Sequence, residues 1–129
     1  MDKNLFKELD EIASDFQVKI LEAALKGNDD NFDVLFELAN AYTSAGRYGE
    51  GLKIDKKLAK IRPSHPIVRY NLACSLSLLG EMDESLEELE ESFKLGYHDY
   101  NYVIRDPDLE NLRKDGRFAT LIEKYLKRT

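Results

Sequence analysis

The chain contains few side chains that could carry out covalent or metal chemistry, and they are widely separated. Its histidines are His65, which lies between two prolines, and His98, which opens the C-terminal segment. A metal site gathers several ligands, and neither histidine has another ligand close to it in sequence. The single cysteine, Cys74, has no neighbouring histidine that would activate it as a nucleophile. We expect both histidines to be surface loop residues and Cys74 to be a small residue on a packed helix.

The motifs of common enzyme classes are also missing from the sequence. It contains no G-x-S-x-G elbow, no phosphate-binding P-loop, no H-E-x-x-H and no C-x-x-C pair. Seven acidic residues between positions 81 and 91 fall on a predicted helix, whereas a calcium-binding loop needs oxygen ligands around a glycine turn. We therefore predict a protein that is not an enzyme and that uses no cofactor and no metal.

Charge and composition exclude several classes of partner. The net charge of −6 argues against nucleic acid, because phosphate binding needs a basic surface. No stretch approaches the roughly 18 apolar residues that span a bilayer, and the acidic N-terminal stretch lacks the apolar core of a signal peptide. A single cysteine excludes an internal disulfide and fits a reducing compartment. We expect a cytoplasmic protein that binds neither nucleic acid nor membrane.

The elements that would position any site come from a stretch of sequence that occurs twice. A shift of 34 residues places Leu38-Ala39 on Leu72-Ala73 and Gly46 on Gly80. The two glycines permit the positive φ of a tight turn between helices. Small residues coincide where two helices would cross closely, Ala39 with Ala73 and Gly51 with Ser85. The constant interval predicts paired helices that repeat along the chain.

This pattern resembles the tetratricopeptide repeat, a helix–turn–helix unit of that length. The resemblance implies an all-α fold, a short solenoid or α–α superhelix that forms a single domain over 1–129. It divides the chain into a capping helix at 3–26, a first repeat at 32–65, a second at 66–99, and a truncated repeat with a closing helix at 100–129. The string from Asp106 to Phe118 is similar to the segment that terminates bacterial arrays of this family.

The first segment, from about Lys3 to Lys26, has apolar residues at steps of three and four that share one face of a helix. They are Leu5, Leu9, Ile12, Phe16, Ile20 and Ala23 or Ala24. We predict one long helix, with a break near Ser14-Asp15 as the alternative. A stack of repeats needs a terminal element that covers its last apolar face, and this helix is the candidate.

In tetratricopeptide proteins the first helix of each repeat lines a concave surface that binds extended peptides or partner helices. The resemblance therefore implies a peptide-binding groove, lined by side chains that point away from the buried stripe. They are Phe36, Asn40, Tyr70, Asn71, Cys74, Leu78 and Arg105. Asparagine amides can bond to a partner's backbone, and the aromatic and leucine side chains offer apolar pockets. We predict a non-catalytic scaffold or adaptor whose partner is another protein.

Two alternative functions stay open. Asn40, Asn71 and Arg105 match three positions of the carboxylate clamp with which some co-chaperones hold the C-terminal tail of heat-shock chaperones. Phe36 and Asn101 stand where that clamp has lysines, which removes much of the charge that selects a carboxylate. The other alternative is a structural protein that forms a homodimer or larger homo-oligomer, with the capping helix or a tyrosine-rich edge (97, 100 and 102) against another copy.

One residue interrupts the apolar pattern of the first repeat. Asp55 stands where the second repeat has Leu89. Because isolated buried charges are rare and costly, we expect Asp55 to be partly exposed. A buried Asp55 would need a partner such as Arg62 or a tyrosine hydroxyl.

Overall fold

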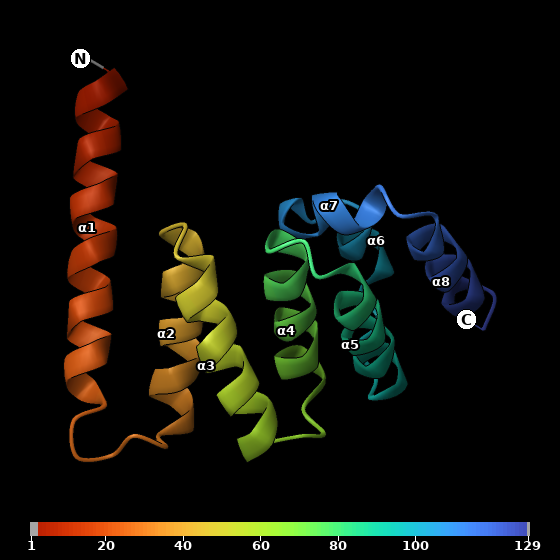
Figure 1. Ribbon diagram of the computed structural model, residues 1–129, viewed down its shortest axis with the longest axis horizontal. Coiled ribbons are helices and arrows are strands. Elements are labelled where there is room, and N and C mark those ends of the chain that lie inside the picture. The colour runs from red at the N-terminus through yellow and green to blue at the C-terminus, as the bar shows by residue number, and fades with distance from the viewer. Residues whose placement is uncertain (1–2, 129) are drawn as a thin grey trace. The chain divides into compact units, whose positions relative to one another are not determined.

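The computed structural model describes residues 3–128. Those residues form helices and no strand, which confirms the predicted all-α fold class (Figure 1). The first segment is one continuous helix without a break at Ser14-Asp15. The elements are α1 (Lys3–Ala24), α2 (Phe32–Ser44), α3 (Tyr48–Ile61), α4 (Pro66–Leu78), α5 (Met82–Lys94), α6 (Tyr100–Val103), the 3₁₀ helix η1 (Pro107–Leu109), α7 (Glu110–Arg113) and α8 (Gly116–Leu126).

Local sequence signals account for where these helices begin and end. The Asn31 side chain accepts a hydrogen bond from the Val34 amide at 3.2 Å and so caps α2. His65 Nδ1 accepts from the Val68 amide at 3.3 Å and caps α4. Gly46 and Gly80 follow α2 and α4 with φ of 77° and 80°, a region that favours glycine. His65 therefore has a structural role as a helix cap, which was not predicted from the sequence.

The contacts within the chain divide it into two compact units, Met1–Ile54 and Asp55–Thr129, and the boundary falls inside α3. The first unit holds α1, α2 and the first half of α3. The second holds the remainder of α3 and all later elements. The sequence predicted one domain with repeats that meet at residue 66, and that division stays a prediction.

In the first unit α1 packs antiparallel to α2 and extends beyond its end (Figure 1). Val18 is fully buried against Leu38, Ala41 and Tyr42. Leu21, Leu25 and Ile54 pack around this cluster. The Tyr42 hydroxyl donates to Glu22 Oε2 at 2.7 Å, and burial with this carboxylate neighbour raises the pKa of Tyr42 to about 12.

The face that α1 buries is not the one that its apolar pattern predicts. Val18 is the buried residue of the helix, and it lies on the side opposite the predicted stripe. The five large residues of that stripe, Leu5, Leu9, Ile12, Phe16 and Ile20, are between 43% and 65% exposed. The helix therefore has two apolar faces, and α2 covers the narrower one, formed by Val18 and Leu21, with Leu25 packing beside them just after the helix ends.

The small residue Gly51 allows α3 to approach α2 within the first unit. A Cβ at Gly51 would lie 2.9 Å from Thr43 Oγ1 and 3.5 Å from the Ala39 carbonyl oxygen. The Thr43 hydroxyl itself donates to that carbonyl at 3.1 Å. The predicted close crossing is present at this position.

We expect Gly51→Ala to lower the free energy of unfolding by roughly 0.5–1 kcal/mol, because the clash at Thr43 outweighs a helix-propensity gain of about 1 kcal/mol. In a Thr43→Ala background the clash is absent, and Gly51→Ala is then expected to stabilise by about the propensity difference. Urea unfolding of the four chains measures both effects. If Gly51→Ala changed the free energy of unfolding in the same direction in both backgrounds, the clash with Thr43 would not be the explanation.

In the second unit α4 and α5 pack against each other and against the C-terminal segments. The Ser85 hydroxyl donates to the Ala73 carbonyl oxygen at 2.7 Å, at the second predicted crossing of small residues. Leu89 is fully buried beside Phe93, Val103 and Leu112, and α8 closes the core with Phe118, Leu121, Ile122 and Tyr125. The core is thus continuous from α4 to α8.

The prediction that Asp55 is partly exposed is wrong. Its side chain is 2% exposed, and Oδ2 accepts a hydrogen bond from the Ser75 hydroxyl at 2.5 Å. Burial raises the pKa of Asp55 to about 7, although the bond from Ser75 acts in the opposite direction. The partner is a serine on α4 rather than Arg62 or a tyrosine.

Candidate protein-binding surfaces

The predicted groove residues of the first unit lie on α2, four residues apart. Phe36 is half-buried with its ring 5.9 Å from that of Phe32, and Asn40 is exposed. Together with Gln17, Glu37, Ala41 and Ser44 they line a hollow of about 350 Å³. An aromatic edge beside an exposed amide can take an apolar side chain and bond to the backbone that carries it.

In the second unit the predicted groove residues differ in exposure. Asn71 and Leu78 are half-buried, and Arg105 is exposed with its Nε donating to the Asn101 carbonyl oxygen at 3.0 Å. Tyr70 and Cys74 are each 5% exposed and belong to the core. The prediction that Tyr70 and Cys74 offer their side chains to a peptide is therefore wrong.

Tyr70 and Cys74 are buried because the segment after α6 folds against α4. The Tyr70 hydroxyl donates to Asp106 Oδ2 at 2.5 Å, and Cys74 Sγ lies 3.8 Å from the same oxygen. The Tyr70 ring also stacks on Tyr97 at a centroid distance of 4.2 Å. Asp106 precedes a proline and caps η1, so its capping role was readable from the sequence, but its long-range partner was not.

The environment of this cluster keeps both α4 side chains protonated. Burial raises the pKa of Tyr70, with Cys74 and Asp106 adding to the effect, and burial raises the pKa of the Cys74 thiol. A buried thiol without a thiolate is a poor nucleophile. Within residues 3–128 there is also no group of three or more His, Cys, Asp or Glu placed to hold a metal ion.

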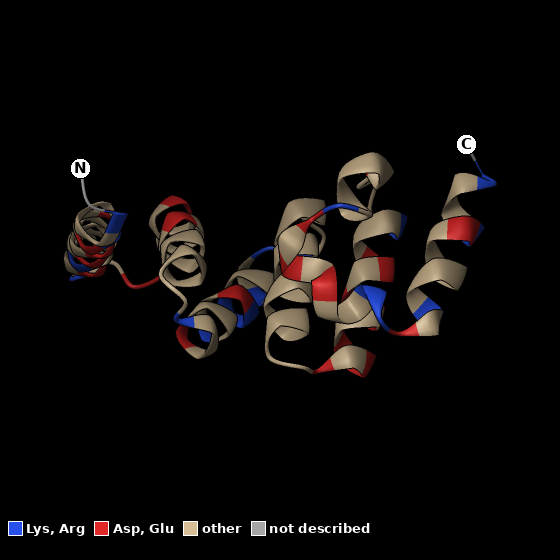
Figure 2. Cartoon of the chain, turned by 90° about the horizontal axis from the view of Figure 1, so that it is seen from above, with Lys and Arg blue, Asp and Glu red and all other residues tan. Residues whose placement is uncertain are grey.

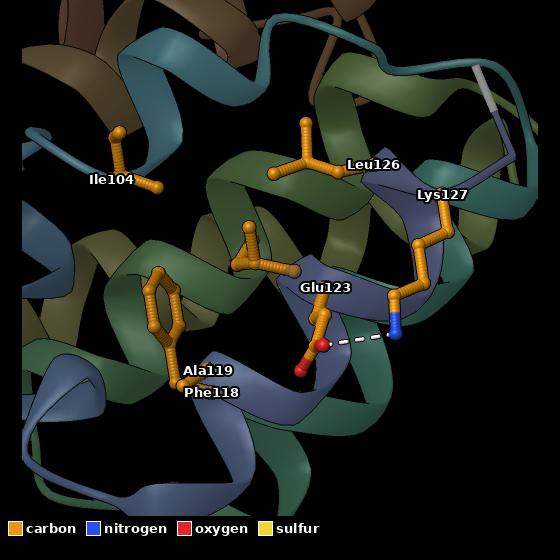
Figure 3. A pocket seen from close by; sticks show the side chains of 7 residues that line it. Ile104, Phe118, Ala119, Glu123, Leu126 and Lys127 are labelled. Atoms are coloured by element: carbon orange, nitrogen blue, oxygen red, sulfur yellow. Dashed lines mark ion pairs between the residues drawn. The ribbon is translucent and has the colours of Figure 1, made fainter.

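A second hollow, of about 440 Å³, lies along α8 and was not predicted from the sequence. Its walls are almost entirely apolar: Ile104 and Leu126, which are 46% and 49% exposed, lie there with Phe118 and Ile122. Ala119, Glu123 and Lys127 complete the lining, and Glu123 pairs with Lys127 at 2.9 Å (Figure 3). We call this hollow the Ile104–Leu126 groove.

Phe118 and Ile122, which line this groove, also belong to the core of the second unit. The exposure of Ile104 could not be predicted from the sequence, because the four-residue helix α6 that precedes it is too short to show a periodicity of apolar residues. None of the helices within residues 3–128 is both long enough and apolar enough to cross a bilayer.

Two curated proteins resemble part of the chain in sequence, and one solved structure resembles its fold. A comparison with models of known protein families finds no match. The chain is 33% identical over 87 residues to a chloroplastic protein of Arabidopsis thaliana, a match that covers 65% of this chain and 26% of that protein. It is 32% identical over 88 residues to Superkiller protein 3 of Saccharomyces cerevisiae, which covers 61% of this chain and 6% of that protein.

The solved structure of MamA MSR-1 C2 resembles the chain with a TM-score of 0.67 at 19% sequence identity. The match covers 90% of this chain and 69% of that one. MamA contains tetratricopeptide repeats, and so do the two relatives. The chain has the tetratricopeptide-repeat fold.

Tetratricopeptide folds generally act as scaffolds for protein–protein interaction. The chain spans only 26% and 6% of the two relatives, so what those whole proteins do is not assigned to it. Two of the hollows on the described residues are candidate protein-binding surfaces, one at Phe36 and Asn40 and one at the Ile104–Leu126 groove.

Proposed function

We propose that the chain is a non-catalytic interaction module that binds a peptide segment or a helix of another protein. The observation that carries this proposal is the Ile104–Leu126 groove, where an almost wholly apolar hollow of about 440 Å³ opens beside exposed Ile104 and Leu126. Isolated exposed leucines are ordinary, but apolar side chains that gather around a hollow are typical of sites that take an anchor residue.

The groove favours a partner with at least one large apolar side chain. Burying such a side chain contributes roughly 1.5–3 kcal/mol. A single anchor is therefore not enough for an affinity of roughly micromolar order, and the partner must make further contacts. Asn71 and Arg105, which the sequence assigns to the peptide groove, belong to the same unit and offer an amide and a guanidinium to a longer partner, although neither lines the Ile104–Leu126 groove. A partner with an acidic residue near its anchor fits this combination.

Peptides selected from a displayed library on the immobilised chain, and then measured by fluorescence anisotropy, test the proposal. We expect Ile104→Glu and Leu126→Glu each to weaken binding at least tenfold, because a carboxylate in the groove loses its hydration. Leu79→Glu is the matched control, since Leu79 is 40% exposed and does not line the groove. Equal loss in the control, or no loss in either groove variant, would contradict the proposal.

The assignment of the second-unit groove residues is tested by Asn71→Ala and Arg105→Ala. A loss of roughly threefold to tenfold in each supports their contact with the peptide. Unchanged affinity in both, with loss in Leu126→Glu, would confine the site to the Ile104–Leu126 groove. Phe36→Ala and Asn40→Ala test the hollow of the first unit in the same assay.

The second candidate function is capture of a C-terminal carboxylate, favoured by asparagine at 40 and 71 and arginine at 105. Its test compares one peptide with a free carboxylate and with a C-terminal amide. A clamp predicts a large loss for the amide, whereas the groove proposal predicts equal binding, because Phe36 and Asn101 replace the two lysines.

A further inference from the structure

The Ile104–Leu126 groove offers very few hydrogen-bonding groups to a bound chain. Five of its seven lining residues are apolar, and the other two, Glu123 and Lys127, pair with each other at 2.9 Å (Figure 3). The other charged residues of α8, Arg117 and Lys124, pair with carboxylates of α5, each at 2.9 Å. Figure 2 shows both signs of charge along α8, at the C-terminal end of the chain. A partner bonds to these charged side chains only if it breaks an ion pair.

This lack of free polar groups limits the backbone conformation of a partner. Every residue of a peptide carries an N–H and a C=O group, except for the missing N–H of proline, and burying these groups without partners is unfavourable. An extended segment depends on the surface on which it lies for these hydrogen bonds. A helix makes them internally, from each N–H to the carbonyl oxygen four residues before it. The groove therefore favours a helical partner over an extended one.

The hollow of the first unit has the opposite character. Beside Phe36, the side chains of Gln17 and Asn40 contribute amides to its lining, and Ser44 contributes a hydroxyl. An amide side chain can both donate to and accept from a peptide backbone. An extended segment can therefore satisfy its backbone in that hollow, whereas it cannot do so in the Ile104–Leu126 groove.

The side chains of α8 that line the groove form two neighbouring rows along the helix. In each row the residues are four positions apart: Phe118, Ile122 and Leu126 in the first, and Ala119, Glu123 and Lys127 in the second. Such rows are the ridges by which helices pack, because a ridge of one helix enters the furrow between two ridges of the other. Each row extends over roughly 12 Å, which matches about two turns of a partner helix.

The groove also continues the core of the second unit. On its inner side α8 packs against α5 and α7, and Phe118 and Ile122 belong both to the core and to the groove. Ala119 is exposed, and its short side chain permits the separation of roughly 8–10 Å between the axes of two packed helices. A helix in the groove would therefore add one further layer to the helices of this unit.

We propose that the Ile104–Leu126 groove binds an amphipathic helix of another protein, with large apolar side chains spaced three and four residues apart on one face. These side chains pack between the two rows of α8 and against Ile104, and the polar face of the partner helix stays in water. This partner class rests on the proposed function, because it specifies the conformation and the chemistry of the segment that the groove takes.

Three synthetic peptides of about 16 residues, built from alanine, glutamate, lysine and leucine, test whether the groove takes a helix. The first has leucines at steps of three and four, the second is the same peptide with proline in place of a central alanine, and the third has its leucines at every second position. Fluorescence anisotropy measures their binding to the full chain, up to roughly 1 mM. We expect the first to bind, and the other two to bind at least roughly tenfold more weakly, because proline breaks a helix and alternation removes its apolar face.

Variants of the chain show where the first peptide binds. Its affinity should be lost in Ile104→Glu and in Leu126→Glu and kept in Leu79→Glu. Equal binding of the three peptides, with loss in Leu126→Glu, would show an extended occupant and would overturn the helix proposal while the proposed function stands. Failure of the first peptide to bind would also overturn the helix proposal. Library-selected peptides that bind equally well to Ile104→Glu and to Leu126→Glu would overturn both.

A substitution at Ala119 separates a packed helix from a single inserted side chain. Ala119→Leu should weaken binding of the first peptide roughly fivefold or more, because the larger side chain keeps the two helices apart. An extended segment with one anchor would instead gain apolar contact. Thr120→Leu introduces the same side chain at an exposed position of α8 outside the groove and should leave binding unchanged. Tighter binding to Ala119→Leu would overturn the helix proposal.

Sedimentation velocity of the chain alone, from roughly 1 μM to 1 mM, tests a second copy as the occupant. We expect the groove to stay open, so that Leu126→Glu leaves the sedimentation coefficient unchanged. Self-association that Leu126→Glu abolishes would show that a second copy fills the groove, and it would overturn the helix of another protein as the partner.

Discussion

Replacement of Asp106 by alanine is expected to lower the free energy of unfolding by about 3 kcal/mol. Asp106 is 4% exposed, and its Oδ2 accepts the Tyr70 hydroxyl at 2.5 Å. Without the carboxylate, the buried hydroxyl has lost its acceptor, which costs about 1–3 kcal/mol. Asp106 Oδ1 also accepts from the Asp108 amide at 3.0 Å, and loss of such a cap costs about 1 kcal/mol.

The contribution of the cap can be separated from that of the buried contact. Asp99 caps α6 by accepting from the Tyr102 amide at 3.2 Å, but its side chain is exposed. Asp99→Ala is therefore the matched control, with an expected loss of about 1 kcal/mol. Urea unfolding followed by circular dichroism gives both values. If Asp106→Ala were no more destabilising than Asp99→Ala, the bond to Tyr70 would contribute nothing.

A double-mutant cycle of Tyr70→Phe with Asp106→Ala should then give a coupling energy of roughly 1–2 kcal/mol, since each change removes the same hydrogen bond. Arg113 also holds this segment, because its Nη1 donates to the Asp106 carbonyl oxygen at 2.7 Å. That contact uses the backbone and survives both substitutions. A coupling energy near zero would mean that the destabilisation by Asp106→Ala comes from contacts other than the Tyr70 hydrogen bond.

The contribution of Asp55 to the stability of the chain is expected to fall as the pH rises from about 4 to about 7, and Asp55→Asn should remove this contribution. The pKa of Asp55 is about 7 in the folded chain, raised by burial from its ordinary value of 3.8. Below pH 3.8 the carboxyl is neutral in both states and its full stabilisation is present. Between the two values only the unfolded state loses the proton, so the folded state loses stability with rising pH.

The size of this effect follows from the difference between the two pKa values. At about 1.4 kcal/mol for each pKa unit, the loss has an upper bound of the order of 4 kcal/mol and is constant above about pH 7. Asparagine keeps the shape and can still accept from the Ser75 hydroxyl. We therefore expect Asp55→Asn to exceed the wild type in stability at pH 8 and to approach it at about pH 4.

Denaturant unfolding at several pH values measures the difference between the two chains. The comparison must be made between variants, because Asp115 has a pKa lowered to about 2 by Arg117, and the pKa of Glu90 is lowered by Lys124. Those groups give the opposite slope in acid solution. Asp33→Asn, at an exposed position of α2, is the control and should retain the wild-type slope. The free energy of unfolding of the wild type is compared with that of Asp55→Asn at each pH. If the wild type were less favoured in this comparison at pH 5 than at pH 8, the predicted sign would be wrong.

The sequence by itself determined the elements and the way they repeat. The 34-residue interval that joins Gly46 to Gly80 located two turns, and both glycines have positive φ. The same interval located the small residues Gly51 and Ser85, each of which lies in close contact with the preceding helix. These features are local or repeat at a fixed interval, so one chain is enough to read them.

The tertiary structure alone decided which surfaces those elements cover. Periodicity shows that Leu5, Ile12 and Ile20 share a face of α1, but it does not show that Val18 on the other side meets α2. Tyr70 and Cys74 have the helical phase of groove residues, and they are buried because Asp106 returns to α4 from more than thirty residues away. Asp55 is buried because Ser75 supplies a donor that spacing cannot reveal. Side-chain spacing records which residues lie together on one helix, whereas burial depends on what packs against that helix.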